Sequence, residues 1–272
     1  MAEWTGRSGA APYRQLFRAQ VRAQASYRGS FGIDVFSSLW TTVIDVCSVL
    51  VLFRVVTSLG GFTVREVLVM VGLVACAFAA ADVAVGNVEK LRRYVRTGLF
   101  DTVLVRPLAV LPQLLLADLQ LRLVGRLVVG ALALAVALLL APIEWTPGRA
   151  LLALVTPVAG AVFFGAIFVA GASVAFWWIE SGELANSVTY GGRDLSMYPM
   201  TIYGEVFRRM FGFGLGFGFV AYYPALALLD RPDPLGLPAW VSWSSPAVAL
   251  VAVAVAGLVW RTGVRHYRST GS

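Results

Sequence analysis

Charged residues are scarce in this chain, and their scarcity excludes an ordinary soluble domain. Only 14% of the 272 residues are charged, whereas 58% are hydrophobic, and the mean hydropathy is +0.76. Soluble domains carry about 25% charged and about 45–50% apolar residues. The excess of apolar side chains therefore predicts a protein that faces lipid.

Lysine and histidine are almost absent, since the chain has one of each, Lys90 and His266. A P-loop needs the pattern Gly-x-x-x-x-Gly-Lys-Ser/Thr, and Lys90 is followed by Leu91 and is not preceded by such glycines. We therefore expect that this chain does not hydrolyse ATP through a P-loop. It also shows no metal-ligand spacing and no nucleophile with a histidine partner, so we expect no catalytic residue and no metal site.

Cysteine is also rare, and both cysteines, Cys47 and Cys76, lie within apolar stretches. A free cysteine in such surroundings behaves as a small hydrophobic residue. We predict that both are buried and that neither forms a disulfide, so they identify no redox compartment.

Long apolar runs are abundant, and they predict the fold class. A transmembrane helix needs about 20 mostly apolar residues. Glycine and proline punctuate the breaks between six such runs. The predicted fold is all-α, a polytopic bundle of six transmembrane helices within residues 32–260. The runs cover residues 32–53, 67–87, 119–141, 150–178, 209–229 and 243–260.

The basic residues predict the orientation of these helices. If the amino terminus is cytoplasmic, eighteen of the 22 basic residues fall on the cytoplasmic side and four outside. Cytoplasmic loops carry an excess of Arg and Lys, so we predict a multi-pass protein of a bacterial inner membrane with both termini in the cytoplasm. The net charge of +7 then reflects topology, and we expect membrane lipid and no nucleic acid as a partner. The four outer residues are Arg54, Arg65, Arg149 and Arg231.

The two terminal segments are expected to lie on the cytoplasmic side. In residues 1–31, apolar residues and arginines separate onto two sides of a helix over residues 13–28. This pattern predicts an interfacial helix on the inner leaflet, either as a simple basic anchor or as an elbow helix that packs on a partner subunit. Residues 261–272 form a cytoplasmic tail.

Charges inside predicted spans are costly and therefore suggest function. Asp118, Arg122 and Arg126 follow one another at four-residue spacing and share one helical stripe. We expect ion pairs between spans. The alternative is a proton or ion relay through the aspartates of the first two spans, as in a secondary transporter. The intramembrane charges are Asp34, Asp45, Asp82, Asp118, Arg122 and Arg126.

The fifth predicted span alternates glycine with phenylalanine. In a regular helix, Gly212 and Gly216 share one face and allow a neighbouring helix to approach closely. We expect tight helix packing there. The alternative is a dimer face or a flexible segment that lines a substrate path, where Phe213 and Phe217 would suit an apolar cargo.

The predicted cytoplasmic loop at residues 88–118 holds the most specific motif. Its charged helical run stops at Gly98, a natural helix terminus. Asp101 is positioned to cap the next short turn, and Pro107 ends it. These features predict a short docking surface held between two membrane helices.

This loop fills the pattern Arg-x-Gly-x-Phe-Asp-x-x-Leu-x-Arg-Pro. The sequence resembles the type-2 permeases of bacterial ATP-binding-cassette (ABC) transporters, in the branch whose cytoplasmic loop has this pattern. The segments 176–180, 198–203 and 223–225 look like later signatures of that branch. The pattern residues are Arg96, Gly98, Phe100, Asp101, Leu104, Arg106 and Pro107.

The resemblance implies a permease subunit of an ATP-driven exporter for a hydrophobic or amphipathic substrate. A separate ATPase subunit would bind ATP and magnesium, and a second permease chain would complete the assembly. A coupling helix within residues 89–107 would sit in a groove of the ATPase. Separately from the resemblance, the charged segment between the fourth and fifth predicted spans, residues 179–208, is a candidate for a second cytoplasmic contact with the ATPase. The coupling residues would be Lys90, Arg92, Arg93, Arg96, Gly98, Phe100, Asp101, Arg106 and Pro107.

Three alternatives remain open at this point. The loop around residues 89–107 is alternatively a positively charged segment that serves topology alone. The protein is alternatively an ion-coupled secondary transporter, or a non-transporting membrane scaffold.

Overall fold

The computed structural model describes residues 28–106, 108–116 and 123–267. Over these residues the protein is helical, and its one β-type feature is an isolated bridge between Leu59 and Phe62. The longer helices are α2 (Arg28–Val55), α3 (Val64–Val85), α7 (Leu123–Leu140), α8 (Pro147–Ser173), α9 (Gly182–Ser196) and α12 (Ser245–His266). The shorter α-helices are α4 (Leu91–Arg96), α5 (Leu99–Leu104), α6 (Val110–Leu116), α10 (Glu205–Phe207) and α11 (Tyr222–Leu228).

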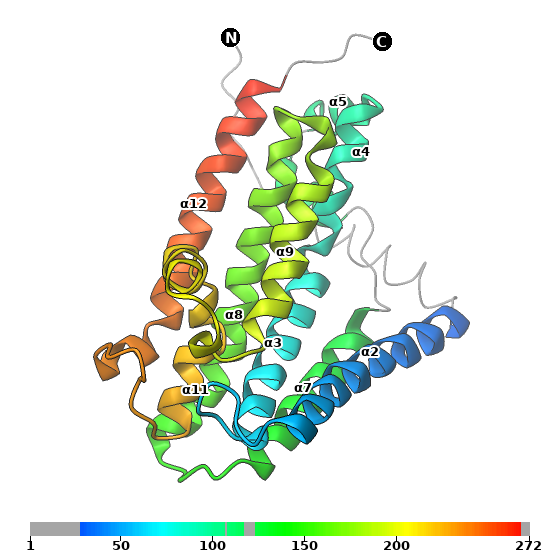
Figure 1. The fold of residues 1–272 in the computed structure, drawn as a ribbon. Coiled ribbons are helices and arrows are strands. Elements are labelled where there is room, and N and C mark those ends of the chain that lie inside the picture. The colour runs from blue at the N-terminus through cyan, green and yellow to red at the C-terminus, as the bar shows by residue number, and fades with distance from the viewer. Residues whose placement is uncertain (1–27, 107, 117–122, 268–272) are drawn as a thin grey trace.

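Helix α8 lies at the centre of the bundle, in contact with α3, α9 and α12 (Figure 1). Helices α2 and α7 pack together on the other side of α3. Small residues bring α3 and α7 into close contact, because a Cβ placed at Gly130 would lie 3.0 Å from the carbonyl oxygen of Ala75. Close approach through glycine is the usual way in which membrane helices associate.

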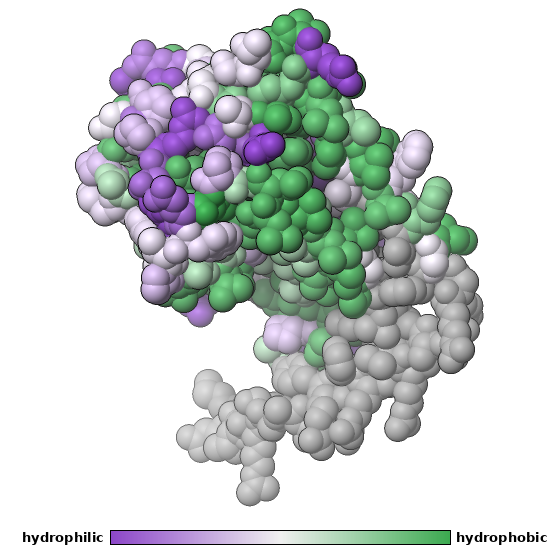
Figure 2. All heavy atoms as spheres, turned by 90° about the horizontal axis from the view of Figure 1, so that it is seen from below, coloured by the Kyte–Doolittle hydropathy of each residue, from purple (hydrophilic) through white to green (hydrophobic). Residues whose placement is uncertain are grey.

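The bundle has two distinct ends, which we name by landmarks. The α5 end holds α4, α5 and the last turn of α12, and the Gly60 end holds the α2–α3 turn (Figure 1). At the Gly60 end, Arg231 pairs with Glu66 at 2.8 Å and lies over the ring of Phe62. Figure 2, which views the molecule from below, shows hydrophilic residues gathered over one part of this end and hydrophobic residues over much of the rest.

Three helices in the described part of the chain are long and apolar enough to cross a membrane, or four if one bent pair counts as a span. They correspond to the second, fourth and sixth predicted spans, and α7, which is apolar but shorter, corresponds to the third. The 28-residue α2 covers the first predicted span. The three long helices are Val64–Arg96, Pro147–Phe176 and Ser245–His266.

The fifth predicted span, residues 209–229, is wrong as a continuous helix. The segments Glu205–Gly214 and Phe217–Leu228 meet at an angle of 66°. Gly216 has φ +87°, a left-handed conformation that ends a right-handed helix and favours glycine. The glycine-rich sequence therefore makes a sharp turn where the apolar content alone suggested a span.

Both ends of this bent segment lie at the Gly60 end, so it enters the bundle and turns back. On the entering side, Thr201 donates a hydrogen bond to the carbonyl of Gly60 at 2.9 Å. On the returning side, the chain follows α8 outward to Asp230, which pairs with Arg149 in the first turn of α8 at 2.5 Å. We call residues 205–228 the re-entrant hairpin.

Helix α9 occupies the place that the sequence assigned to a connection. We expected residues 179–208 in the cytoplasm, but α9 packs lengthwise against α8 and α3, from the α5 end toward the Gly60 end (Figure 1). A hydropathy search does not find α9, because its sequence contains many polar residues. Its Arg193 is nevertheless accommodated inside the bundle, where it pairs with Asp45. Pro199 follows the end of α9 at Ser196, as expected for a residue that breaks helices.

The cysteine prediction is half right. Cys76 is buried, but Cys47 is exposed on α2. An outward-facing residue on a membrane helix contacts lipid, so its apolar neighbours in sequence do not imply burial in protein. The predicted elbow helix, Pro107, Asp118, Arg122 and the end of the tail at residues 268–272 lie outside the described residues, as does the side chain of Asp34.

Candidate functional site

Helices α4 and α5 form a tight hairpin at the α5 end. The turn between them contains Gly98 at φ +69°, a conformation that costs an L-residue about 1–2 kcal/mol. The predicted stop at Gly98 is therefore confirmed. The predicted cap is not, because Gly98 itself holds the N-cap position of α5 and Asp101 lies inside the first turn.

One side of the α4–α5 hairpin is anchored in the bundle by apolar side chains. Leu91, Val95, Phe100 and Val103 are buried. The ring of Phe100 packs edge-on against Phe176, at the α8–α9 connection, with centroids 5.2 Å apart.

The end of α12 meets the same anchor. The ring of Tyr267 lies 4.8 Å from that of Phe100. Burial and the neighbouring Asp101 carboxylate raise the pKa of Tyr267. Phe100, which sequence reasoning grouped with the coupling residues, therefore ties the hairpin to two parts of the bundle, the α8–α9 connection and the end of α12, and does not face outward.

The basic residues of the hairpin divide into two groups. Arg96 forms an ion pair with Glu180, and a Cβ at Gly182 would collide with the guanidinium of Arg92, so both arginines lie against the α8–α9 connection. Lys90 is half-buried. Arg93 and Arg106 are exposed. Arg96 is exposed as well, but its ion pair directs it toward Glu180.

Exposed apolar residues lie beside these two arginines. Val105 is 84% exposed, and Leu99 and Leu104 are each about two-fifths exposed. Arginine and apolar side chains together are typical of protein interfaces, in which arginine is enriched and lysine depleted. We call this surface the coupling face. It comprises Arg93, Thr97, Leu99, Thr102, Leu104, Val105 and Arg106.

The predicted intramembrane charges whose side chains the structure describes, Asp45, Asp82 and Arg126, each pair with a residue of another helix, as we expected. Asp82 of α3 forms an ion pair with Arg126 of α7. Asp45 of α2 lies 2.5 Å from Arg193 of α9, and the two side chains are 18% and 16% exposed. Charged groups inside membranes are stable when they pair. Pairing with arginine favours a structural role for these two aspartates over a proton relay.

Arg193 is the residue whose place in the bundle sequence reasoning missed. It was assigned to the cytoplasm, but it bridges two bundle helices and lies over the ring of Phe78 at 5.6 Å. A signal was present in the sequence, because small residues recur at three- and four-residue spacing along this segment. Such a stripe is typical of the packed face of a membrane helix. Its members are Ala185, Thr189, Gly192 and Ser196.

The glycine-rich segment packs tightly, although not in the predicted way. Gly212 lies in a π-helical stretch against Met200, whereas Gly216 lies in the turn against Val248, so the two do not share a helix face. Phe217 is buried and stacks on Phe211 with ring centroids 4.5 Å apart.

Phe213 differs from its phenylalanine neighbours in this segment. It is exposed on the outside of the re-entrant hairpin. Of the two phenylalanines singled out in the sequence for a substrate path, the structure therefore leaves only Phe213 accessible within one chain.

Comparison with known proteins identifies the family. The family described as ABC-2 family transporter protein matches residues 39–271. Searches of curated proteins and of solved structures each found no match. The matched region runs from α2 through the whole of α12 and includes the α4–α5 hairpin. The chain therefore belongs to the ABC-2 family of transporter proteins, and it is an ABC transporter permease.

Proposed function

We propose that this chain is the membrane permease subunit of an ATP-driven exporter and that the coupling face receives the motion of a separate ATPase subunit. The observation that carries this proposal is the two-sided α4–α5 hairpin. Its buried side is fixed through Phe100 to the α8–α9 connection and to the end of α12, and its other side offers exposed arginine and apolar groups. A force on the coupling face is therefore transmitted to the helices of the bundle.

The proposed topology has six crossings, made by α2, α3, α7, α8, α9 and α12. Helix α9 replaces the glycine-rich segment as the fifth crossing, and the re-entrant hairpin enters from the outer side. With this change, Arg208 and Arg209 move to the outer side and Arg193 into the membrane. Fifteen of the 22 basic residues then remain cytoplasmic and six lie outside, so the charge bias still supports cytoplasmic termini.

The proposed assembly contains two permease chains, alike or different, with two ATPase subunits in a bacterial inner membrane. ATP and magnesium belong to the ATPase subunits. Closure of the ATPases would shift the permease helices between inward-open and outward-open or closed states. Apolar and aromatic walls suit a hydrophobic or amphipathic cargo taken from the cytoplasm or the inner leaflet.

The coupling face is tested by charge reversal in the reconstituted complex. Arg93→Glu is expected to reduce vanadate-sensitive ATPase stimulation by the permease about thirtyfold or more, because truncating or reversing a buried interface charge costs about 2 kcal/mol or more. Arg265→Glu is the matched control, because Arg265 is an exposed arginine at the same end of the bundle but outside the hairpin.

Two outcomes would contradict the proposal. If mild-detergent isolation from the native host recovers no ATPase subunit, the proposal that this chain is part of an ATP-driven exporter is wrong. If the ATPase co-purifies but Arg93→Glu behaves like Arg265→Glu, the protein is still a permease, and the coupling surface lies elsewhere.

A further inference from the structure

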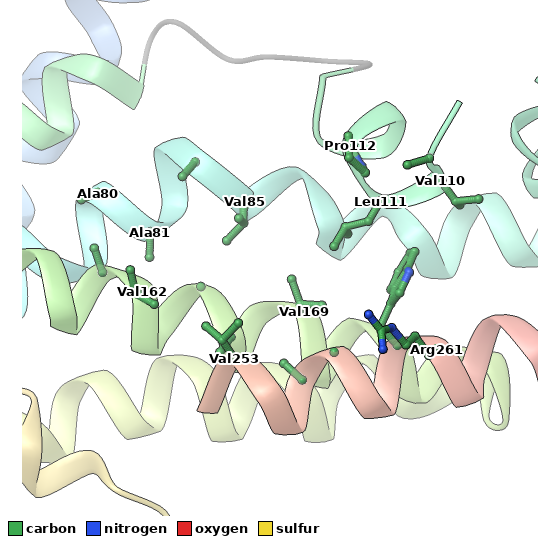
Figure 3. A pocket seen from close by; sticks show the side chains of 18 of the residues that line it. Ala80, Ala81, Val85, Val110, Leu111, Pro112, Val162, Val169, Val253 and Arg261 are labelled. Carbon is green, nitrogen blue, oxygen red and sulfur yellow. The ribbon is translucent and has the colours of Figure 1, made fainter. Parts of the chain in front are cut away.

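A groove runs along the side of α8 between α3 and α12, and α6 lies at one end of it (Figure 3). Its volume is about 600 Å³. Small residues from three helices keep the groove open: Ala84 on α3, Gly165 and Ala166 on α8, and Gly257 on α12. A Cβ at Gly257 would meet no atom within 4 Å, so this glycine borders empty space.

The length of the groove matches one leaflet of a bilayer. Its lining on α8 extends from Val158 to Val169, which is about 17 Å at a rise of about 1.5 Å per residue. The hydrocarbon core of a bilayer is about 30 Å thick, so one leaflet contributes about 15 Å. On α12 the lining extends from Val253 to Arg261, toward the α5 end.

Arg261 is the one charged residue among those that line the groove in the described part of the chain. Its side chain points to the same space as those of Leu111 and Val169 (Figure 3). No ion pair or hydrogen bond to its guanidinium occurs within the described residues, which distinguishes it from Arg126 and Arg193. Trp260, the adjacent residue, is buried and also lines the groove.

We propose that this groove binds an anionic phospholipid of the cytoplasmic leaflet, with one acyl chain along α8 and the headgroup phosphate on Arg261. The apolar lining matches the chain, the length matches one leaflet, and the unpaired guanidinium complements the phosphate. Basic pockets between membrane helices on the cytoplasmic side are suited to anionic headgroups. The proposal uses the orientation given above but does not depend on transport or on the ATPase.

Photo-crosslinking tests the proposal on the full-length purified chain. The probe is phosphatidylglycerol with a diazirine in its acyl chain, and mass spectrometry locates the crosslinked peptides. We expect crosslinks on α8 near Gly165 and on α12 near Gly257. Unlabelled phosphatidylglycerol should compete with the probe better than phosphatidylcholine does.

Two variants separate the acyl-chain site from the headgroup site. Gly257→Leu fills the groove and should abolish the crosslinks, whereas Gly191→Leu, at another helical glycine with open space around it, should leave them intact. Arg261→Gln should weaken competition by phosphatidylglycerol about fivefold, the effect of one basic residue at an anionic surface. Arg54→Gln, an exposed arginine at the opposite end, is its control.

If Arg261→Gln leaves competition by phosphatidylglycerol unchanged, the assignment of the headgroup phosphate to Arg261 is wrong. Loss of crosslinks in Gly257→Leu together with reduced competition in Arg261→Gln supports the proposal. If phosphatidylcholine competes as well as phosphatidylglycerol, or if Gly257→Leu is labelled like the unmodified chain, the proposal is wrong. Neither failure affects the proposed role of the coupling face, which is tested by ATPase stimulation.

Discussion

The ion pair between Asp45 and Arg193 provides the sharpest test of the fold, because it places α9 inside the bundle. The pair joins α2 to α9, and both side chains are mostly shielded from solvent. Removing one partner from a buried pair costs about 3–5 kcal/mol, since the other charge is left uncompensated. We therefore expect Arg193→Gln to destabilise the protein by about 3 kcal/mol or more.

The measurement is reversible unfolding of the detergent-solubilised chain by SDS titration, followed by circular dichroism. Arg209→Gln is the matched control, because the Arg209–Glu205 pair is 77% and 62% exposed and such helix pairs contribute about 0.3–0.5 kcal/mol. Asp45→Asn in the Arg193→Gln background should recover part of the loss, because groups in contact couple by about 0.5–3 kcal/mol.

Two results would refute this reasoning. If Arg193→Gln costs no more than Arg209→Gln, the Arg193 guanidinium is solvated, as it would be in a cytoplasmic connection. If the effects of Asp45→Asn and Arg193→Gln simply add, the two side chains do not interact, and another contact must hold α9 in place.

Two further predictions concern topology and the hairpin turn. In a background with Cys47→Ala and Cys76→Ala, Gly204→Cys should react with a membrane-impermeant maleimide in intact cells. Thr97→Cys should react only after permeabilisation. The reverse pattern would show that residues 179–208 are cytoplasmic, as the sequence alone predicted. Gly98→Ala should cost about 1–2 kcal/mol in the same SDS titration, because φ is positive there. It should also reduce ATPase stimulation, whereas Gly204→Ala, where φ is −59°, should have no effect on either; equal effects of the two variants would argue against a strained turn.

Part of the functional site was predictable from the sequence, because it depends on local rules. Gly98 ends α4 since only glycine adopts a left-handed conformation at low cost. The arginines around it identify a basic loop between two apolar runs. Which residues of the loop are buried and which are exposed was not predictable, because the burial of Phe100 depends on Phe176 and Tyr267, which are distant in sequence.

Two elements, α9 and the re-entrant hairpin, show why hydropathy alone fails to place particular helices. Helix α9 contains Glu183, Arg193 and Asp194, and its sequence alone predicts a segment that faces water. Its main charge is neutralised by Asp45, 148 residues earlier in the chain. The re-entrant hairpin presents the opposite problem, because it is apolar enough to span a membrane but turns at Gly216.

Composition by itself determined that this protein is a helical membrane protein, because lipid requires apolar helices, and the charge distribution predicts its orientation. The family pattern around Arg96 indicated a permease, and the family match agrees. Only the tertiary structure decided which apolar segments form long helices and which bend, which arginines of the α4–α5 hairpin are exposed, and where the groove beside α8 lies. Those properties arise from contacts between helices far apart in sequence, and no local pattern encodes them.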